Sequence, residues 1–409
     1  MSPSPNVVIV GNGVAGVTAA RIIKEKNPET LVSIYTDESY HYYPRPRLYE
    51  VLSGEAKPRE VYMFSEEWYE KKGIMVQLNE KALSIDIDRK ELLLEGGSRV
   101  NYDKLLLANG GHSFVPPIKG VEKTGVFTLR TIKDALNIKE FTKTTKKVII
   151  IGGGLLGLEF ASSLKKLGQQ VRVVELFPRL LPKQLDPDGA TILKNRIASR
   201  GIDIVLGAKT VEILGKETVS GILLDRGETI SGDLVLISAG MRSNTELALE
   251  AGIKVNRGIV VDRNLRTSAD DVYAVGDAAE FEGRVYGIIP AALEQASIAA
   301  ANMLGEEDNI YAGTVPSNTL KVVDVELTSI GLVNPEESRY EEIKKTDKKK
   351  GVYKKLVLDK GKIVGAILLG DKKGFTSIKK LIAQETDITK YKDSILKDDF
   401  DYKKLATLT

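Results

Sequence analysis

The sequence of 409 residues contains no cysteine, two histidines and one tryptophan. Without cysteine the chain can form no disulfide, offers no thiolate nucleophile, and has no sulfur ligand for an iron–sulfur or zinc centre. His41 and His112 are its only imidazoles, so we predict no metal site, and we expect His112 to be structural. Any redox chemistry would therefore reside on a bound organic cofactor.

Charge of one sign and long hydrophobic runs are also scarce. Lysine and arginine number 59 against 56 acidic residues, and this balance predicts neither a nucleic-acid partner nor a membrane partner. The longest apolar stretch, residues 148–161, is broken by four glycines and should form a strand, a turn and a helix instead of a membrane span. Residues 1–5 lead to a strand at Val7 without room for a signal peptide, so we expect a cytoplasmic protein.

What the chain does have is glycine in a particular arrangement. The β-rich run 6–10 enters G-N-G-V-A-G at residues 11–16, and a helix is expected over 17–24. In such a G-x-G-x-x-G turn a side chain would block the tight turn, the approach of a pyrophosphate, or the packing of helix on sheet. The start of the helix offers free N–H groups and about half a positive charge to a phosphate. A single copy can also be a chance glycine turn.

A second copy of the pattern begins at Gly152. The apolar run 147–151 enters G-G-G-L-L-G at residues 152–157, a helix should follow Gly157, and a strand ending at Glu175 closes the unit. Glu175 lies close to the roughly 20 residues after the first glycine at which an acid binds ribose. In the first unit the acids Asp37 and Glu38 come one or two positions late, so which of them binds ribose stays open. Two units predict two dinucleotides side by side, and a duplicated fold with inactive sites is the alternative.

Three further segments resemble the pyridine nucleotide–disulfide oxidoreductase superfamily, the flavoprotein reductases with two dinucleotide sites. Residues 105–111 (L-L-L-A-N-G-G) resemble its A-T-G crossover, with Asn109 in place of threonine. Residues 239–244 (A-G-M-R-S-N) resemble the return crossover G-x-R-P-N, with Ser243 in place of proline. Residues 267–278 (T-S-A-D-D-V-Y-A-V-G-D-A) match its second FAD fingerprint closely.

The resemblance covers nearly the whole chain and implies its fold. We expect an α/β protein with two Rossmann-like dinucleotide-binding domains, the NAD domain being inserted in the FAD domain, and a small α+β C-terminal domain. The implied boundaries are 1–112 with 245–310 for the FAD domain, 113–244 for the NAD domain, and 311–409 for the C-terminal domain.

The resemblance also implies which residues hold the two cofactors, FAD and NADH. Asp277 would bind the FAD ribityl chain, and a helix beginning near residue 293, with Gln295, would point its N-terminus at the flavin pyrimidine. Arg130 would contact FAD, with a surface ion pair as the alternative, and Ala82 would contact the adenine through its backbone. Glu159 would be the catalytic residue at the nicotinamide, with an ordinary first-turn acid as the alternative. The remaining cofactor-binding positions are Gly11, Gly13, Val14, Ala15, Gly16, Asp37, Glu38, Arg45, Pro46, Asn109, Gly110, Gly152, Gly154, Leu155, Leu156, Gly157, Glu175 and Gly240.

Two regions favour one branch of the superfamily. The motif Y-x-R-P-x-L at residues 43–48 resembles the rubredoxin reductases, the ferredoxin reductases and the flavin module of NADH-dependent nitrite reductases, where the arginine reaches FAD. The alternative is a surface loop whose arginines bridge helices. Segments within 315–371 resemble the same branch, with a hairpin turn expected at residues 359–361. Branches that need a cysteine beside the flavin are excluded. Full-length nitrite reductase would continue into iron–sulfur and sirohaem domains, so we expect a flavin part or a free-standing reductase.

The expected function is that of an FAD-dependent NADH oxidoreductase, which takes hydride from NADH onto FAD and passes electrons to a small redox carrier such as rubredoxin. An NADH oxidase or a flavin-bearing electron-transfer component of a nitrite or nitrate reductase is one alternative, and a non-enzymatic FAD/NADH-binding redox sensor is another. NADH should be preferred over NADPH, because Glu175 would repel a 2′-phosphate. The basic run 344–355 should be a solvated loop or a docking patch for an acidic carrier.

Overall fold

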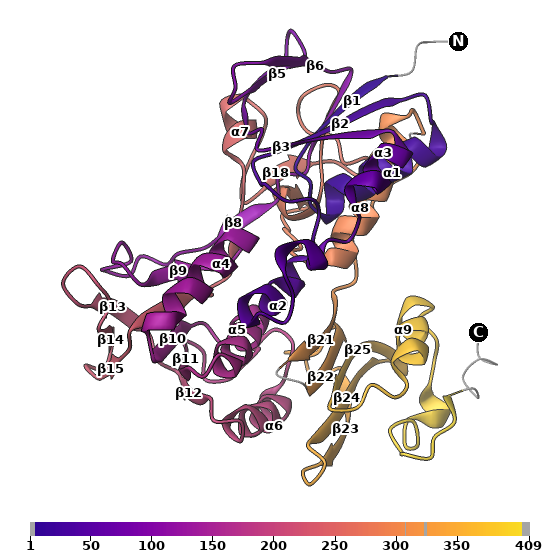
Figure 1. Ribbon diagram of the computed structural model, residues 1–409. Helices are drawn as coiled ribbons and strands as arrows, with labels where there is room; N and C mark the ends of the chain where they lie inside the picture. Colours follow the sequence, from indigo (N-terminus) through magenta and orange to yellow (C-terminus); the bar gives the residue numbers. More distant parts are fainter. Residues whose placement is uncertain (1–4, 307, 323–324, 403–409) are drawn as a thin grey trace. The chain divides into compact units, whose positions relative to one another are not determined.

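The computed structural model describes residues 5–306, 308–322 and 325–402, and these divide into two compact units (Figure 1). Unit 1 contains the described residues of segments 1–114, 130–135 and 241–314, and unit 2 contains those of segments 115–129, 136–240 and 315–409. Each unit contains a parallel sheet with helices of the Rossmann type, which confirms the predicted α/β class and its two dinucleotide-binding folds. The three-domain boundaries drawn from the sequence stay a prediction.

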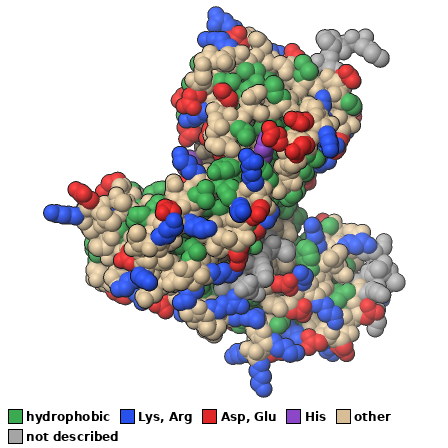
Figure 2. Space-filling view, in the orientation of Figure 1, with side chains coloured by type: hydrophobic (Ala, Val, Ile, Leu, Met, Phe, Trp, Pro, Cys, Tyr) green, Lys and Arg blue, Asp and Glu red, His purple; other side chains and the backbone are tan. Residues whose placement is uncertain are grey.

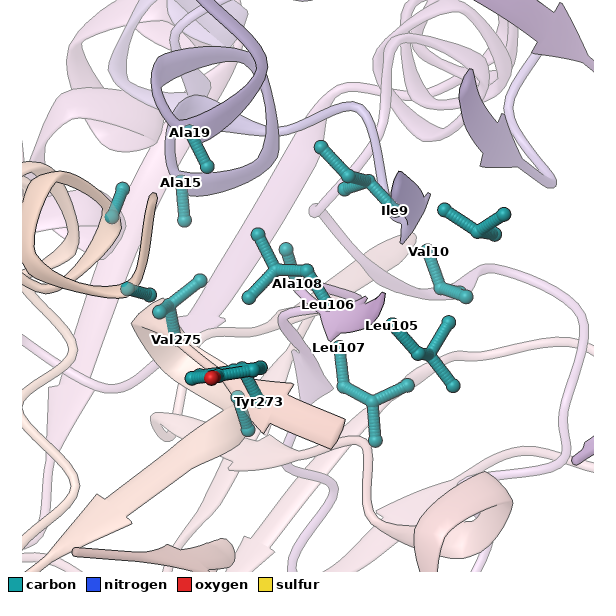
Figure 3. Close-up of a cluster of buried hydrophobic side chains, with 14 of the residues drawn as sticks. Ile9, Val10, Ala15, Ala19, Leu105, Leu106, Leu107, Ala108, Tyr273 and Val275 are labelled. Carbon is teal, nitrogen blue, oxygen red and sulfur yellow. The ribbon is translucent and has the colours of Figure 1, made fainter. Parts of the chain in front are cut away.

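The parallel sheet of unit 1 has the strand order β19-β7-β1-β2-β3. Its strands are β1 (Asn6–Val10), β2 (Leu31–Thr36), β3 (Ile74–Leu78), β7 (Lys104–Leu107) and β19 (Val272–Ala274). Helices α1 (Val14–Lys26) and α8 (Ile289–Met303) pack beside one another in the same unit. Because a parallel sheet is covered on both faces, its strands are continuous apolar runs. Figure 3 shows Ile9 and Val10 of β1 packed with Leu105, Leu106 and Leu107 of β7, Tyr273 of β19, Val275, and Ala15 and Ala19 of α1.

Shorter elements complete unit 1. An antiparallel sheet contains β4 (Ala82–Asp86), β5 (Glu91–Leu94) and β6 (Arg99–Asn101), while β8 (Gly111–Ser113) pairs with β17 (Met241–Ser243) and β18 (Ile259–Val261) pairs with β20 (Ala279–Phe281). The remaining helices are η1 (Arg45–Arg47), α2 (Leu48–Ser53), η2 (Pro58–Val61), α3 (Glu66–Lys72), α7 (Glu246–Glu250) and η4 (Gly276–Ala278). Helix α4 (Ile132–Phe141) begins in unit 1 and ends in unit 2.

Unit 2 contains the second parallel sheet, ordered β12-β11-β10-β16-β9. Its strands are β9 (Val126–Thr128), β10 (Lys147–Ile151), β11 (Gln170–Glu175), β12 (Asp203–Leu206) and β16 (Leu234–Ile237). The same part of unit 2 contains the helices α5 (Leu155–Lys166), α6 (Pro187–Ala198) and the short η3 (Thr142–Thr144). It also contains an antiparallel sheet of β13 (Thr210–Leu214), β14 (Gly221–Leu224) and β15 (Thr229–Ser231).

The C-terminal part of unit 2 is an antiparallel sheet ordered β21-β22-β25-β24-β23. Its elements are β21 (Ser317–Val322), β22 (Val325–Gly331), β23 (Glu341–Asp347), β24 (Val352–Asp359), β25 (Lys362–Leu369), α9 (Phe375–Ala383) and η5 (Thr389–Tyr391). Helix α9 packs on this sheet through Ile378 and Leu381. The predicted hairpin is present between β24 and β25, where Lys360 (φ +50°) and Gly361 (φ +80°) form its two-residue turn. Both residues have the positive φ that such a turn requires.

Three helices begin earlier than the sequence predicted. Helix α1 begins at Val14 and α5 at Leu155, inside the glycine turns, because Gly16 and Gly157 carry no Cβ to collide with the carbonyls of Gly11 and Gly152. Glu159 is consequently the fifth residue of α5, and its alternative interpretation as a first-turn acid is wrong. Helix α8 begins at Ile289 and not near residue 293, since a proline in the first turn presets φ and has no N–H to leave unpaired.

The basic run 344–355 is neither a loop nor a continuous patch, so its interpretation as a solvated loop is wrong. It lies on β23 and β24, where Lys354 pairs with Asp371 at 2.6 Å and Lys345 pairs with Asp398 at 2.7 Å. Lys354 and Lys355 are adjacent and point to opposite faces of the sheet, yet both are buried, because both faces of β24 are covered. Composition alone does not reveal this. The exposed lysines of the run are Lys344 and those of the turn 348–350, and Figure 2 shows basic side chains at the tip of this hairpin, at the bottom of the view. Docking of a carrier there stays a prediction.

Among the described residues, we find no helix with both the length and the apolar character that a membrane crossing requires.

Candidate functional site

The first glycine turn, residues 11–16, connects β1 to α1 and has two closed sides and one open side. Gly11 has φ +108°, and a Cβ there would collide with the Ala108 carbonyl and lie 2.9 Å from the Asn109 nitrogen. A Cβ on Gly16 would collide with the Gly11 carbonyl. Gly13, the helix N-cap, would meet no described atom within 4 Å. The outer glycines thus allow close packing, and the middle one leaves space beside the helix start that a phosphate could enter.

The second glycine turn, residues 152–157, repeats this geometry in unit 2. Gly152 has φ +113° and lies against the Ser238 carbonyl, while Gly157 lies against the Gly152 carbonyl. Gly154, the N-cap of α5, would again meet no described atom within 4 Å. Since β10 is paired with β11 and β16, the turn lies at the carboxyl edge of the sheet, where open α/β sheets bind their ligands.

A partly buried network connects several of the predicted FAD-binding residues of unit 1. Arg45 forms an ion pair with Glu38, contacts the Tyr43 hydroxyl, and donates to the Arg130 carbonyl at 3.0 Å. Arg130 in turn forms an ion pair with Asp277 at 2.9 Å, and about a fifth of its side chain is exposed. Three segments far apart in the sequence, around residues 38–45, 130 and 277, are therefore joined. Arg130 thus forms a partly buried ion pair, and Arg45 contacts Glu38, Tyr43 and the Arg130 backbone; whether either arginine reaches FAD stays a prediction.

Tyr43 is the centre of this network, a role that the motif did not reveal. Its hydroxyl donates to Glu38 and accepts from the Ile132 backbone N–H at 3.2 Å as well as from Arg45. Burial raises the pKa of Tyr43, so the hydroxyl stays protonated. Glu38 is engaged by these partners, whereas Asp37 is exposed at the end of β2. Which of the two acids binds ribose stays a prediction.

The two crossover segments, residues 105–111 and 239–244, are joined by reciprocal hydrogen bonds. Asn109 donates to the Asn244 carbonyl at 3.1 Å, and Asn244 donates back to the Asn109 carbonyl at 2.7 Å. Ser243 donates to the Asp277 carbonyl at 2.6 Å, and His112 is hydrogen-bonded to Asn244. Of the residues at which the chain departs from the superfamily pattern, Asn109 thus joins the two crossovers, and Ser243 joins the return crossover to the segment of Asp277. The structural role expected of His112 stays a prediction.

Eight buried side-chain polar atoms of unit 1 have no partner among the described residues, and four of them belong to predicted FAD-binding segments: Nδ2 of Asn12, Oδ1 of Asn109, Nε of Arg130 and Nε2 of Gln295. Each belongs to a different predicted FAD-binding segment. A buried polar group without a hydrogen bond costs about 1–3 kcal/mol, so protein interiors rarely contain several together. Unpaired donors and an acceptor beside an open glycine turn fit a polar ligand such as a dinucleotide. Asn12 was not predicted from the sequence, although a polar residue inside the glycine turn was visible there.

Other predicted FAD-binding residues have structural roles near the same turn. Gln295 lies in the second turn of α8, is 1% exposed, and accepts from the Gly276 N–H at 2.8 Å, so it positions the backbone beside Asp277. Gly110 lies close to Arg130. Val14 and Ala15 form the first turn of α1, Pro46 lies in η1, and Ala82 begins β4. Their contacts with a cofactor stay predictions.

In unit 2, Glu175 ends β11 as predicted, but its carboxylate is already bonded within the protein. One oxygen accepts from the Gly153 N–H at 2.6 Å and the other from the Phe177 N–H at 2.8 Å, and the residue is 6% exposed. Each carboxylate oxygen can accept a second bond, so ribose binding stays a prediction. Leu155 and Leu156 begin α5, Glu159 follows one turn later, and Gly240 (φ +110°) would meet no described atom within 4 Å.

A family model described as pyridine nucleotide-disulphide oxidoreductase matches residues 5–300, which include both glycine turns and the Asp277 fingerprint. The chain belongs to the pyridine nucleotide-disulphide oxidoreductase family. A second model, described as the rubredoxin NAD+ reductase C-terminal domain, matches residues 316–386. The C-terminal antiparallel sheet is thus of the type found in the branch that the sequence had indicated.

Relatives within the family differ in length. A nitrite reductase [NAD(P)H] of Bacillus subtilis is 38% identical over 384 residues, which cover 94% of this chain and 48% of that protein. The NADH-rubredoxin oxidoreductase of Clostridium acetobutylicum is 32% identical over 380 residues, covering 93% of this chain and 94% of that one. A ferredoxin reductase structure from Rhodopseudomonas palustris has a TM-score of 0.88 at 26% identity and covers 98% of this chain and 99% of that one. The chain spans about half the length of the first of these relatives and nearly all of the other two.

Proposed function

We propose that the protein is an FAD-dependent NADH oxidoreductase that delivers electrons to a small redox carrier such as rubredoxin, and that it acts in the cytoplasm. The observation that carries the proposal is the pair of glycine turns. Each connects a central parallel strand to a helix start and leaves its middle glycine open to space. One such turn is common to many nucleotide-binding proteins, but two in one cysteine-free chain fit a reductase that works with two dinucleotides.

In unit 1 the proposal assigns each group a part in binding FAD. The free N–H groups at the start of α1 would bind the pyrophosphate beside Gly13. The unpaired atoms of Asn12, Asn109 and Arg130 would gain partners from the ligand, and Asp277 would accept a hydrogen bond from its ribityl chain. When bound, FAD supplies the redox chemistry, accepting a hydride from NADH and releasing electrons to the acceptor.

In unit 2 the start of α5 and the opening at Gly154 would bind the pyrophosphate of NADH, and Glu175 would bind its ribose. Glu159, one turn along the helix, would orient the nicotinamide. The protein's contribution to the reaction is then to hold the two reacting rings in contact and to exclude water, since no protein nucleophile is needed.

An anaerobic titration with NADH tests this proposal. The purified protein should be yellow, contain one FAD per chain, and lose its visible flavin absorbance within the mixing time of a stopped-flow instrument. Stoichiometric iron or zinc in the isolated protein, or flavin that NADH does not bleach, would refute it. Bleaching without turnover in the presence of any acceptor would instead indicate a redox sensor.

A second candidate is the flavin-bearing part of a nitrite or nitrate reductase. The 38% identity to a nitrite reductase of Bacillus subtilis over 94% of this chain favours it. NADH consumption that depends on added rubredoxin would support the first candidate. Consumption that depends on a separately purified nitrite or nitrate reductase subunit would support the second, and consumption by dioxygen alone would indicate an oxidase.

A further inference from the structure

The segment between β11 and α6, residues 176–186, directly follows the predicted ribose-binding glutamate. Its interior is closely packed, since Leu180 and Leu185 are fully buried and Leu181 is 1% exposed. Leu181 also has φ +49°, a conformation that side chains other than those of Gly, Asn and Asp rarely adopt. A bulky residue keeps such a conformation only where its surroundings enforce it. This segment is therefore held in one shape by its neighbours.

One end of the segment forms part of the second glycine turn. Glu175 accepts from the N–H groups of both Gly153 and Phe177. The side chain of Leu180 closes the back of the turn, because a Cβ placed on Gly153 would lie 2.7 Å from Cδ2 of Leu180. Any movement of residues 177–180 would therefore be transmitted to the backbone of the turn.

The other end of the segment is held by the C-terminal sheet. The Tyr353 hydroxyl on β24 donates to Asp186 at 2.5 Å, and the Lys355 ammonium lies 3.3 Å from the same carboxylate oxygen. Asn334, after β22, donates to the carbonyls of Pro182 and Leu185 at 3.1 and 3.2 Å. The other oxygen of Asp186 accepts from the Gly189 N–H and so caps α6.

These contacts are buried, unlike an ordinary surface contact. Tyr353 is fully buried, Lys355 and Asp186 are each 2% exposed, and Lys355 is also paired with Glu342 at 2.6 Å. Removing one member of such a group leaves the others unpaired away from water, so the arrangement tolerates little displacement. A continuous set of contacts thus runs from β24 through Asp186 and Leu180 to Gly153.

We propose that the C-terminal sheet is a positioning element of the dinucleotide site, in which Tyr353, Lys355 and Asn334 hold residues 176–186 and thereby shape the glycine turn that receives NADH. The inference rests on the proposed function for the identity of the ligand. It gives the C-terminal sheet a part in nucleotide affinity within its own chain, in addition to any part in contacting a carrier. None of these three residues needs to touch the nucleotide.

Matched variants separate positioning from general stability. Tyr353→Phe and Lys355→Met break the contact with Asp186. Tyr402→Phe and Lys354→Met are the controls, since Tyr402 donates to the Ile395 carbonyl and Lys354 pairs with Asp371, all within the C-terminal part. Lys354 is as deeply buried as Lys355 and adjacent to it on β24, so its loss disturbs the sheet without touching the segment.

The first measurement is nucleotide binding, with ferricyanide as the electron acceptor. Tyr353→Phe and Lys355→Met should raise the KM for NADH and the Kd for NAD+ by about three- to tenfold, and kcat should change less than about twofold, because ground-state binding is what is lost. FAD content should equal that of wild type. The two controls should leave the KM and the Kd within about twofold of wild type.

The second measurement needs no nucleotide. Backbone hydrogen exchange in residues 152–157 and 176–186 should accelerate in Tyr353→Phe and Lys355→Met but not in the controls. Unchanged exchange in those segments, or equal effects of Lys354→Met and Lys355→Met on KM, would overturn the positioning role. Failure of NADH to reduce wild-type flavin would instead overturn the proposed function, and the exchange experiment would still decide whether the sheet holds the segment.

Discussion

The two glycine turns have the same backbone geometry but are supported by different groups. The register of the sheets makes the comparison direct, because Val10 pairs with Tyr35 in unit 1 and Ile151 pairs with Val174 in unit 2. Glu175 therefore corresponds to Thr36. The carboxylate of Glu175 accepts from both Phe177 and the turn itself, whereas the Thr36 hydroxyl accepts from the Glu38 N–H at 3.3 Å.

The position corresponding to Gly153 is Asn12, whose side-chain oxygen accepts from the Tyr69 hydroxyl at 3.3 Å. The first turn is thus contacted by a side chain from α3, and the second by its own strand end and the segment that follows it. A shared turn fixes where a pyrophosphate can lie, and the surrounding side chains decide which dinucleotide is held there. The predictions below test how far the two turns differ.

The largest losses of stability and cofactor binding are expected at the two turn glycines that combine a positive φ with close contact to a carbonyl. Gly11→Ala and Gly152→Ala each force an alanine to a positive φ, which costs about 1–2 kcal/mol, and push a Cβ into a carbonyl, which costs about 1–3 kcal/mol more. We expect Gly11→Ala to lose FAD, and Gly152→Ala to keep FAD but lose reduction by NADH. Urea unfolding and flavin absorbance measure both outcomes.

The matched controls are Gly13→Ala and Gly154→Ala, where a Cβ would meet no described atom within 4 Å. Their stability should change by less than about 1 kcal/mol, since only the helix N-cap is altered. Binding of the corresponding dinucleotide should still weaken, because the new methyl group fills the opening. Normal FAD content in Gly13→Ala would show that the opening of the first turn does not receive the pyrophosphate.

Glu175→Ala should separate the two turns most clearly. It leaves the Gly153 N–H without its acceptor, at a cost of about 1–3 kcal/mol, so the KM for NADH should rise about tenfold or more. Thr36→Val removes one long hydrogen bond and should change FAD content and KM by less than about twofold. Equal effects of the two variants would mean that the acid is not what distinguishes the turns.

Nucleotide preference tests the charge of Glu175 alone. We expect kcat/KM to favour NADH over NADPH by at least about tenfold, or roughly 1.4 kcal/mol, because a 2′-phosphate would lie beside the carboxylate. Glu175→Gln keeps an acceptor for a backbone N–H and should narrow the gap by improving NADPH. Arg179 would act in the opposite direction and favour NADPH, because its Nε is buried without a partner among the described residues and could attract the 2′-phosphate. Steady-state rates with both nucleotides decide, and better use of NADPH by wild type contradicts the assignment.

A smaller effect is expected from pH, and it concerns the second turn. Burial alone would raise the pKa of Asp186, but hydrogen bonds from Tyr353 and the Gly189 N–H, with the charge of Lys355, outweigh it and lower the pKa. The folded state therefore favours the ionised form. Its stabilisation is present above the ordinary carboxyl pKa of about 4 and is lost as the pH falls through the lowered value. Between about pH 5 and pH 3, wild type should lose more stability than Asp186→Asn in urea unfolding, and parallel losses would contradict this.

Much of the architecture followed from local sequence alone. The strand, glycine turn and helix at residues 6–16 and again at 147–157 were legible because each glycine meets a steric demand of its immediate neighbours, and these demands depend on a few consecutive residues. The absence of cysteine likewise excluded the branches that need a thiol beside the flavin, and the motif at residues 43–48 favoured one of the others without a structure. The hairpin turn at Lys360 and Gly361 was predictable for the same local reason.

The first residues of helices and the burial of charged runs were harder to predict from the sequence. The starts of α1, α5 and α8 were placed three or four residues late, since glycine in the two turns and Pro290 in α8 are tolerated within the first helical turn. The run 344–355 was misread because the covering of both sheet faces and distant acids decide which lysines are buried.

The sequence by itself therefore determined the fold class, both glycine turns, the family and the lack of a thiol. Only the tertiary structure decided that Tyr43 joins Glu38 to Arg45, that Asn109 and Asn244 join the crossovers, and that Tyr353 and Lys355 hold the segment beyond Glu175. The physical reason is range. Steric and hydrogen-bonding demands of a turn act over a few residues, whereas Asn109 lies 135 positions from Asn244 and Tyr353 lies 167 positions from Asp186, where a single sequence carries no signal of which polar groups meet.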